Sequence, residues 1–218
     1  FSNKNSCCAH CLRGKMSAAP ALKRQACLAQ QLSGIVVVDF GHYVAGPLVG
    51  RLLADQGAEV IKIDPPDGPR WHSEANRTLN HGKHMMQLDL KTPAGLRQIR
   101  QLLARADVVI ENFRPGVMTS LGLNLKELRQ DWPRLVTVSL PGFASDDVEH
   151  AGLRAYEGII AAVTGIFIDM GLDRTLEGYS PCYSALPQAS VYAAVMASLA
   201  VVSALVARHA SGVGDQIE

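Results

Sequence analysis

Short β-branched runs alternate with helical patterns along most of the chain, and this alternation limits the fold more than any other feature of the sequence. From Leu32 onward, each short apolar run is followed by a segment whose apolar residues recur at helical spacing. This order is typical of an α/β fold with a largely parallel, Rossmann-like sheet flanked by helices. We expect strands at 35–40, 58–64, 85–90, 107–111, 135–140 and 215–218, and helices at 47–56, 93–106, 125–130, 155–163 and 188–208.

The last expected helix contains a long, uncharged and mostly apolar stretch, Val191–Ala207. It is just short of the ~20 apolar residues that span a bilayer, and it is rich in Ala and Ser rather than in Leu and Ile. A helix that is apolar on most faces is typical of a buried position between other elements. We therefore expect a core helix and no membrane partner.

Composition and charge narrow the function classes. With 218 residues, 48% of them hydrophobic, the chain can bury a sizeable core. The formal net charge of +1 gives no global field that would recruit nucleic acid, so we expect no nucleic-acid partner. A site for an anionic ligand must therefore be built locally.

Cysteine use separates the first residues from the rest. Four of the five cysteines lie in the first 27 residues, whereas a disulfide framework would space them through the fold. This distribution predicts an intracellular, cytoplasmic protein. The Cys7–Cys11 segment contains residue types that bind zinc, but no second pair of ligands follows at the spacing of a zinc finger. The segment is therefore either a metal site or a flexible leader. We favour the leader and expect no metal. The expected organisation is a leader or linker at 1–31 and one domain at 32–218.

The loop 41–47 follows the first strand and opens the first helix, which is where backbone N–H groups can meet a phosphate. It lacks the three-glycine spacing of a dinucleotide fingerprint, and Pro47 removes one N–H donor. We therefore expect no NAD. From these residues alone, an ordinary tight turn is an equally good interpretation.

Several ordered segments resemble the class III CoA-transferase family, which includes formyl-CoA transferase, carnitine CoA-transferase and α-methylacyl-CoA racemase. The matching segments are Leu32–Gly34, Val37–Phe40, Ala45–Pro47, Leu53–Ile63, Asn80–Lys83, Leu88–Lys91 and Ala106–Gly116. The resemblance implies the first half of a Rossmann-like fold whose subunits interlock as a homodimer. Because the sequence begins at Phe1 and ends as a strand begins, we expect a fragment truncated at its C-terminal end.

The resemblance also implies a binding site for coenzyme A. Phosphates bind charge-assisted donors, and adenine binds in an apolar slot. Lys62 and Lys83 could instead be solvated, Arg114 could pair with Glu111, and Phe113 could belong to the core. The coenzyme-binding residues implied are Tyr43, Val44, Ala45, Lys62, Asn80, Lys83, Asn112, Phe113, Arg114 and Arg154.

Arg154–Glu157 resembles the basic-x-Tyr-Glu segment of formyl-CoA transferases, which implies that Glu157 assists in the active site. The racemases of the family carry a His in this region that moves the α-proton, and His suits this role because its pKa is near neutrality. Here the position is Tyr156, so racemization is disfavoured. Glu157 could instead pair with Arg154 on a helix surface.

Enzymes of the family use an Asp before the long apolar helix as the nucleophile that attacks the acyl-CoA thioester. Alignment of the helix places that position at Ser190, or at Leu186 if a gap is allowed, and neither is a carboxylate. Asp169 and Asp173 lie too early in the sequence. We therefore predict no catalytic nucleophile in this segment.

Two functions remain in view. One is coenzyme A transfer between an acyl-CoA and a carboxylic acid, with the nucleophile supplied by a tandem partner domain in a longer chain. The alternative is a non-catalytic domain for coenzyme binding and dimerisation.

Overall fold

The computed structural model describes residues 31–167, 178 and 183–218. The expected leader lies outside these residues except for its last position, and Asp169 and Asp173 also lie outside them.

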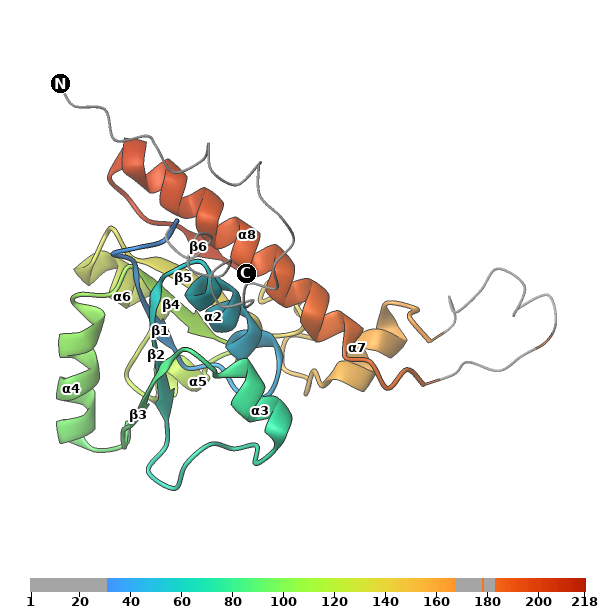
Figure 1. Cartoon of the computed structure of the whole chain (residues 1–218). Helices are drawn as coiled ribbons and strands as arrows, with labels where there is room; N and C mark the ends of the chain where they lie inside the picture. The colour runs from blue at the N-terminus through green and yellow to red at the C-terminus, as the bar shows by residue number, and fades with distance from the viewer. Residues whose placement is uncertain (1–30, 168–177, 179–182) are drawn as a thin grey trace, which may run out of the picture.

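The core of the molecule is a six-stranded, all-parallel sheet in the order β3-β2-β1-β4-β5-β6, which confirms the expected Rossmann-like α/β fold (Figure 1). This is the strand order of the doubly wound dinucleotide-binding fold. Its switch point lies between β1 and β4, where Val38 pairs with Ile61 on one side and with Val109 on the other. The strands are β1 Val36–Asp39, β2 Glu59–Asp64, β3 His84–Gln87, β4 Val108–Glu111, β5 Val136–Ser139 and β6 Gln216–Ile217.

Helices cover both faces of this sheet, and successive strand residues alternate between the two cores. Val37 packs with residues of α2 and α8, whereas Val38 packs with residues of α4, α5 and α6. Both valines are completely buried. The helices are α2 Ala45–Asp55, α3 Glu74–Leu79, α4 Pro93–Leu103, α5 Val117–Ser120, α6 Leu125–Asp131, α7 Glu157–Val163 and α8 Gln188–Ser211.

Two elements differ from the sequence-based expectation. The strand expected at 85–90 spans His84–Gln87, because Asp89 turns the chain and accepts a hydrogen bond from the Thr92 hydroxyl at the cap of α4. The helix α3 lies in a stretch without apolar periodicity, where Ser73 caps it by accepting the Asn76 N–H at 3.1 Å.

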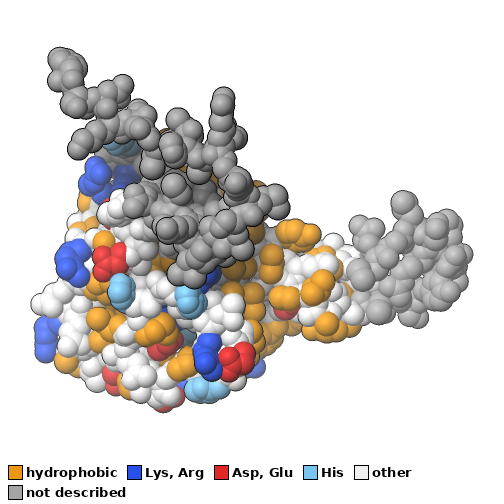
Figure 2. Space-filling view, in the orientation of Figure 1, with side chains coloured by type: hydrophobic (Ala, Val, Ile, Leu, Met, Phe, Trp, Pro, Cys, Tyr) orange, Lys and Arg blue, Asp and Glu red, His pale blue; other side chains and the backbone are white. Residues whose placement is uncertain are grey.

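The long helix α8 packs on α2 through small side chains, which allow the two helices to approach closely. Among the described residues, only the face of α8 that packs on α2 and the sheet is covered. The structure therefore differs from the expectation of a helix buried between other elements. The uncovered face is apolar, with exposed side chains at Tyr192, Val195, Met196, Leu199 and Val206. Hydrophobic side chains gather where α7 and the first turns of α8 project from the body (Figure 2). By length and composition, α8 is the one helix in the described ranges that could cross a membrane.

Candidate functional site

A cavity of about 1550 Å³ opens at the carboxyl edge of the sheet. Ligands of doubly wound proteins bind at this edge, outside the ends of the parallel strands. Its walls come from the segments after β1 to β5, from α7 and from the first turns of α8. The wall includes residues of the segments 42–45, 64–70, 88–91, 112–117, 154–160 and 187–193.

The β1–α2 loop brings Tyr43, Val44 and Ala45, three of the expected coenzyme-binding residues, to the cavity wall. The loop is tight, because a Cβ on Gly41 would lie 2.6 Å from the Gly46 Cα. Tyr43 adopts φ = 60°, a left-handed conformation that is uncommon for residues other than glycine. Such strain is characteristic of positions where the backbone serves a ligand site.

His42 and Asn112 join the loops that follow β1 and β4. The His42 N–H donates to Asn112 Oδ1 at 2.7 Å, and Asn112 Nδ2 donates to the His42 carbonyl at 2.8 Å. Both the oxygen and the nitrogen of the Asn112 side-chain amide therefore form hydrogen bonds with the loop after β1, and Asn112 also lines the cavity. Phe113 lines the cavity and also packs on the core.

The imidazole of His42 also lines the cavity, with its ring centroid 4.9 Å from that of Phe113 in an edge-on arrangement. Burial, together with the nearby charge of Lys62, lowers the pKa of His42 to about 4. The ring is therefore neutral at pH 7. His42 was not among the residues expected to bind the coenzyme. The only sequence feature that pointed to a site at His42 was its position in the loop after a buried strand.

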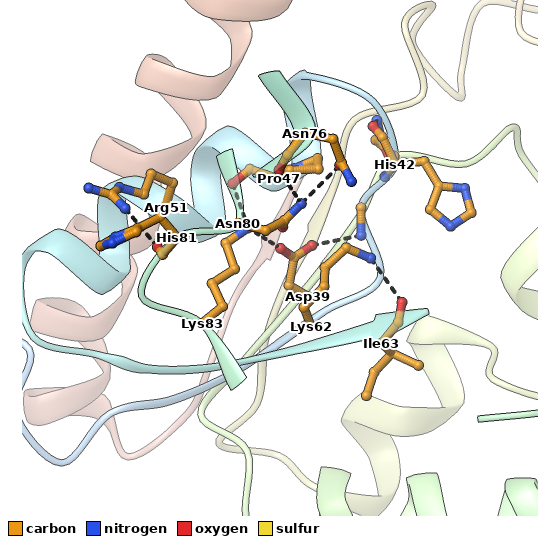
Figure 3. A network of polar contacts seen from close by, with 12 residues as sticks. Asp39, His42, Pro47, Arg51, Lys62, Ile63, Asn76, Asn80, His81 and Lys83 are labelled. Atoms are coloured by element: carbon orange, nitrogen blue, oxygen red, sulfur yellow. Dashed lines mark hydrogen bonds and ion pairs between the residues drawn. The ribbon is translucent and has the colours of Figure 1, made fainter. Parts of the chain in front are cut away.

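Lys62, Asn80 and Lys83 were expected to bind the coenzyme, and none of the three lines the cavity. Their side chains instead take part in a network of polar contacts within the protein (Figure 3). Lys62 Nζ is buried and donates to the Ile63 carbonyl at 2.9 Å and to Asp64 Oδ1 at 3.0 Å. Lys83 Nζ forms an ion pair with Asp39 Oδ2 at 2.7 Å, and both side chains are 0% exposed. The alternative that Lys62 and Lys83 are solvated is wrong, because each ammonium is enclosed in a buried ion pair.

Four exposed cations line the cavity instead. Arg70 pairs with Asp67 at 2.8 Å. Within the described part of the chain, the side chains of Lys91, Arg114 and Arg154 have no hydrogen bond or ion pair. Their charges are therefore available to an anionic ligand.

The alternative pairing of Arg114 with Glu111 does not form. The Glu111 carboxylate accepts hydrogen bonds from the Ser139 hydroxyl and from the Phe113 N–H, the latter at 2.7 Å. Burial raises the pKa of Glu111 above its ordinary value. Glu111 thus stabilises the loops behind the cavity wall through these hydrogen bonds and does not pair with Arg114.

Glu157 lies on the cavity wall and fastens the beginning of α8. Its carboxylate accepts the N–H groups of Ala189 at 2.8 Å and Ser190 at 2.9 Å, and also the Ser190 hydroxyl. It therefore does not pair with Arg154. The structure also separates the two alignments of the nucleophile position, because Ser190 lines the cavity whereas Leu186 is 67% exposed and lies outside the wall.

No group of three or more His, Cys, Asp or Glu side chains that could hold a metal ion occurs among the residues that the structure describes.

Comparisons with known proteins agree with this geometry. The CoA-transferase/lyase DddD of Marinomonas sp. is 49% identical over 187 residues, which are 86% of this chain and 22% of that protein. The succinate–glutarate CoA-transferase of Agrobacterium fabrum is 31% identical over 86% of this chain and 50% of its own length. The crystal structure of the hypothetical protein Rv3272 from Mycobacterium tuberculosis superposes with a TM-score of 0.78 at 32% identity, over 87% of this chain and 54% of that one. The chain thus spans about half the length of most of these relatives and about a fifth of DddD. The profile of CoA-transferase family III matches residues 32–218, and the chain belongs to this family.

Proposed function

We propose that this chain is the coenzyme A-binding half of an enzyme that transfers coenzyme A between an acyl-CoA thioester and a carboxylic acid. The observation that carries the proposal is the cavity at the carboxyl edge of the sheet, whose wall bears Lys91, Arg114 and Arg154, three cations with no partner among the described residues. Its volume of about 1550 Å³ exceeds the ~300–1000 Å³ of ordinary small-molecule sites. A long ligand with several anionic groups fits this combination of size and charge.

Coenzyme A carries a 3′-phosphate and a pyrophosphate, and each prefers charge-assisted donors. In the proposal, Arg114, Arg154, Lys91 and Arg70 supply these donors. Phe113 and the Tyr43–Ala45 wall supply the apolar surface for the adenine ring. The neutral imidazole of His42 lies beside them and adds no charge to the site at pH 7.

The nucleophile is proposed to come from outside this segment, from a tandem partner domain in a longer chain. The residue aligned with the family's nucleophile is Ser190, whose hydroxyl donates a hydrogen bond to Glu157. The exposed apolar face of α8 supports a partner, since apolar patches of this kind mark protein–protein contacts. A cytoplasmic location belongs to the same proposal, because residues 28–181 contain no cysteine that could form a disulfide.

Calorimetry with coenzyme A on the full-length protein tests the binding site. Loss of one charge-assisted contact costs ~1.5–3 kcal/mol, so Arg114→Gln should weaken binding by roughly ten- to a hundredfold. Lys126→Gln is the matched control, because Lys126 is an exposed cation outside the cavity wall. Equal affinities in the two variants, or no binding to the wild-type protein, would refute the proposal.

The alternative of a non-catalytic coenzyme-binding and dimerisation domain rests on Ser190 at the nucleophile position. Incubation of the full-length protein with acyl-CoA donors, followed by hydroxylamine and peptide mass spectrometry, separates the two functions. Transfer activity with a modified carboxylate outside residues 150–218 supports the proposal, and the absence of both activity and modification supports the alternative. A modified acid within 150–218 would show that this half supplies the nucleophile itself.

A further inference from the structure

The ammonium group of Lys83 has no donor left for a ligand. Its Nζ donates to Asp39 Oδ2 at 2.7 Å, to the Pro47 carbonyl at 2.7 Å and to Asn80 Oδ1 at 2.9 Å. A lysine ammonium has three N–H donors, so these contacts use all of them. The acceptors come from the end of β1, the first turn of α2 and the cap of α3, so Lys83 joins the turn at 80–83 to two segments that lie 44 and 36 residues earlier in the chain.

Asp39 transmits this contact to the loop that forms the cavity wall. Its Oδ1 accepts the Gly41 N–H at 2.7 Å while its Oδ2 accepts from Lys83. The pair lies directly against α2, because a Cβ on Gly50 would be 2.7 Å from Asp39 Oδ2 and 3.0 Å from Lys83 Nζ. The ion pair, the first turns of α2 and the loop therefore pack as one unit.

A second contact fastens the turn at 80–83 to the same helix. Arg51 on α2 donates to the His81 carbonyl at 2.7 Å, and Asn80 is itself held by Asn76 at 2.9 Å (Figure 3). These contacts hold the turn on α2 in addition to the ion pair between Lys83 and Asp39. The ammonium is thus held by geometry that does not depend on a ligand.

We propose that Lys83 is a positioning residue, which acts through Asp39 to hold residues 41–46 in the conformation that lines the coenzyme site. It does not contact the phosphates. For the identity of the ligand, this inference rests on the proposed function.

The test uses the full-length protein with Lys83→Met, Asp39→Asn and the double variant, which removes both charges and avoids leaving one of them buried without a partner. Arg208→Met is the matched control, because the buried Arg208 forms an ion pair with the partly exposed Asp107, and both lie outside the cavity wall. Hydrogen exchange of residues 41–46 is measured without ligand. Dissociation constants for coenzyme A and for 3′-dephospho-coenzyme A are measured by calorimetry well below the melting temperature.

We expect exchange at 41–46 to accelerate by about tenfold or more in each Asp39 and Lys83 variant, and not in the Arg208 control. Affinity for both ligands should fall by a similar factor of about tenfold, so their ratio stays unchanged, and the double variant should be no weaker than the weaker single one. If a single variant fails to fold, the double variant carries the same readouts.

Two results would overturn the inference. One is unchanged exchange at 41–46 in the double variant. The other is a selective loss of coenzyme A over its dephospho form in Lys83→Met with Asp39→Asn unaffected, which is the behaviour of a direct phosphate ligand. A wild-type protein that binds neither ligand refutes the proposed function, while loop exchange still decides the role of Lys83.

Discussion

The beginning of α8 depends on a carboxylate that lies more than thirty residues earlier in the chain, and Glu157→Ala removes it. The N–H groups in the first turn of a helix have no partner within the helix. The residue that precedes α8, Pro187, provides no side-chain cap. Glu157 provides it instead, by accepting the Ala189 and Ser190 N–H groups at 2.8 and 2.9 Å together with the Ser190 hydroxyl.

The magnitude follows from these contacts. A hydrogen bond to a charged group contributes ~1.5–3 kcal/mol, and loss of a helix N-cap costs ~1 kcal/mol. Glu157 is only half-buried, so water replaces part of what is lost. We expect the free energy of unfolding to fall by ~2 kcal/mol, which lowers Tm by ~4–8 °C for a domain of this size. Glu157→Gln keeps one acceptor oxygen and should lose about half as much.

Urea denaturation of the full-length protein, with hydrogen exchange at residues 189 and 190, measures the effect. Glu74→Ala is the matched control, because the side chains of the Glu74–Arg77 pair are 83% and 77% exposed and such pairs contribute ~0–1 kcal/mol. Equal losses in Glu157→Ala and Glu74→Ala, or unchanged exchange at 189 and 190, would refute the reasoning.

Two further predictions concern the loop after β1. Because the pKa of His42 falls from 6.5 to about 4, unfolding takes up a proton below pH 6.5, and the free energy of unfolding should decrease as the pH falls from 6.5 towards 4. His42→Gln should reduce this decrease in urea titrations at pH 7 and pH 5, and identical differences in the two proteins would contradict it. Gly41→Ala should destabilise the protein by ~2 kcal/mol or more, because its Cβ would meet backbone at 2.6 Å. Gly152→Ala, with no atom within 4 Å of its Cβ, should change the thermal melt little, and equal melts would show that the loop is not as tight as described.

The fold could be predicted because its central strands are buried on both faces. Such strands have continuous apolar runs, as β1 and β4 do, and these runs stand out from the helical segments between them. The edge strand β3 was misplaced by a few residues because all four of its residues are exposed, so burial does not mark its ends. The helix α3 buries no residue, and its cap at Ser73 is the only local signal.

The site could be predicted by segment but not by contact. The resemblance identified loops that do form the cavity, including those at Tyr43, Phe113 and Arg114. The pairing of Lys62 with Asp64 could have been predicted from the sequence, because residues two apart on a strand share a face. The pairing of Lys83 with Asp39 was not, since 44 residues separate them and only the fold brings them together.

The strand order of this sheet is that of dinucleotide-binding proteins, yet the usual phosphate position at the first loop is closed. In the dinucleotide fold, glycines after the first strand leave room for a pyrophosphate at the helix N-terminus. Here Gly41 and Gly46 are already in contact with each other, Pro47 removes a donor from the first turn of α2, and Asp39 places a carboxylate beneath the loop. Under the proposed function, the phosphates of the coenzyme therefore bind nearer the later loops, where Lys91, Arg114 and Arg154 are unpaired among the described residues. The proposed site thus uses the same edge of the sheet as the dinucleotide fold but takes its phosphate donors from other loops, because side chains of the first loop fill the usual phosphate position.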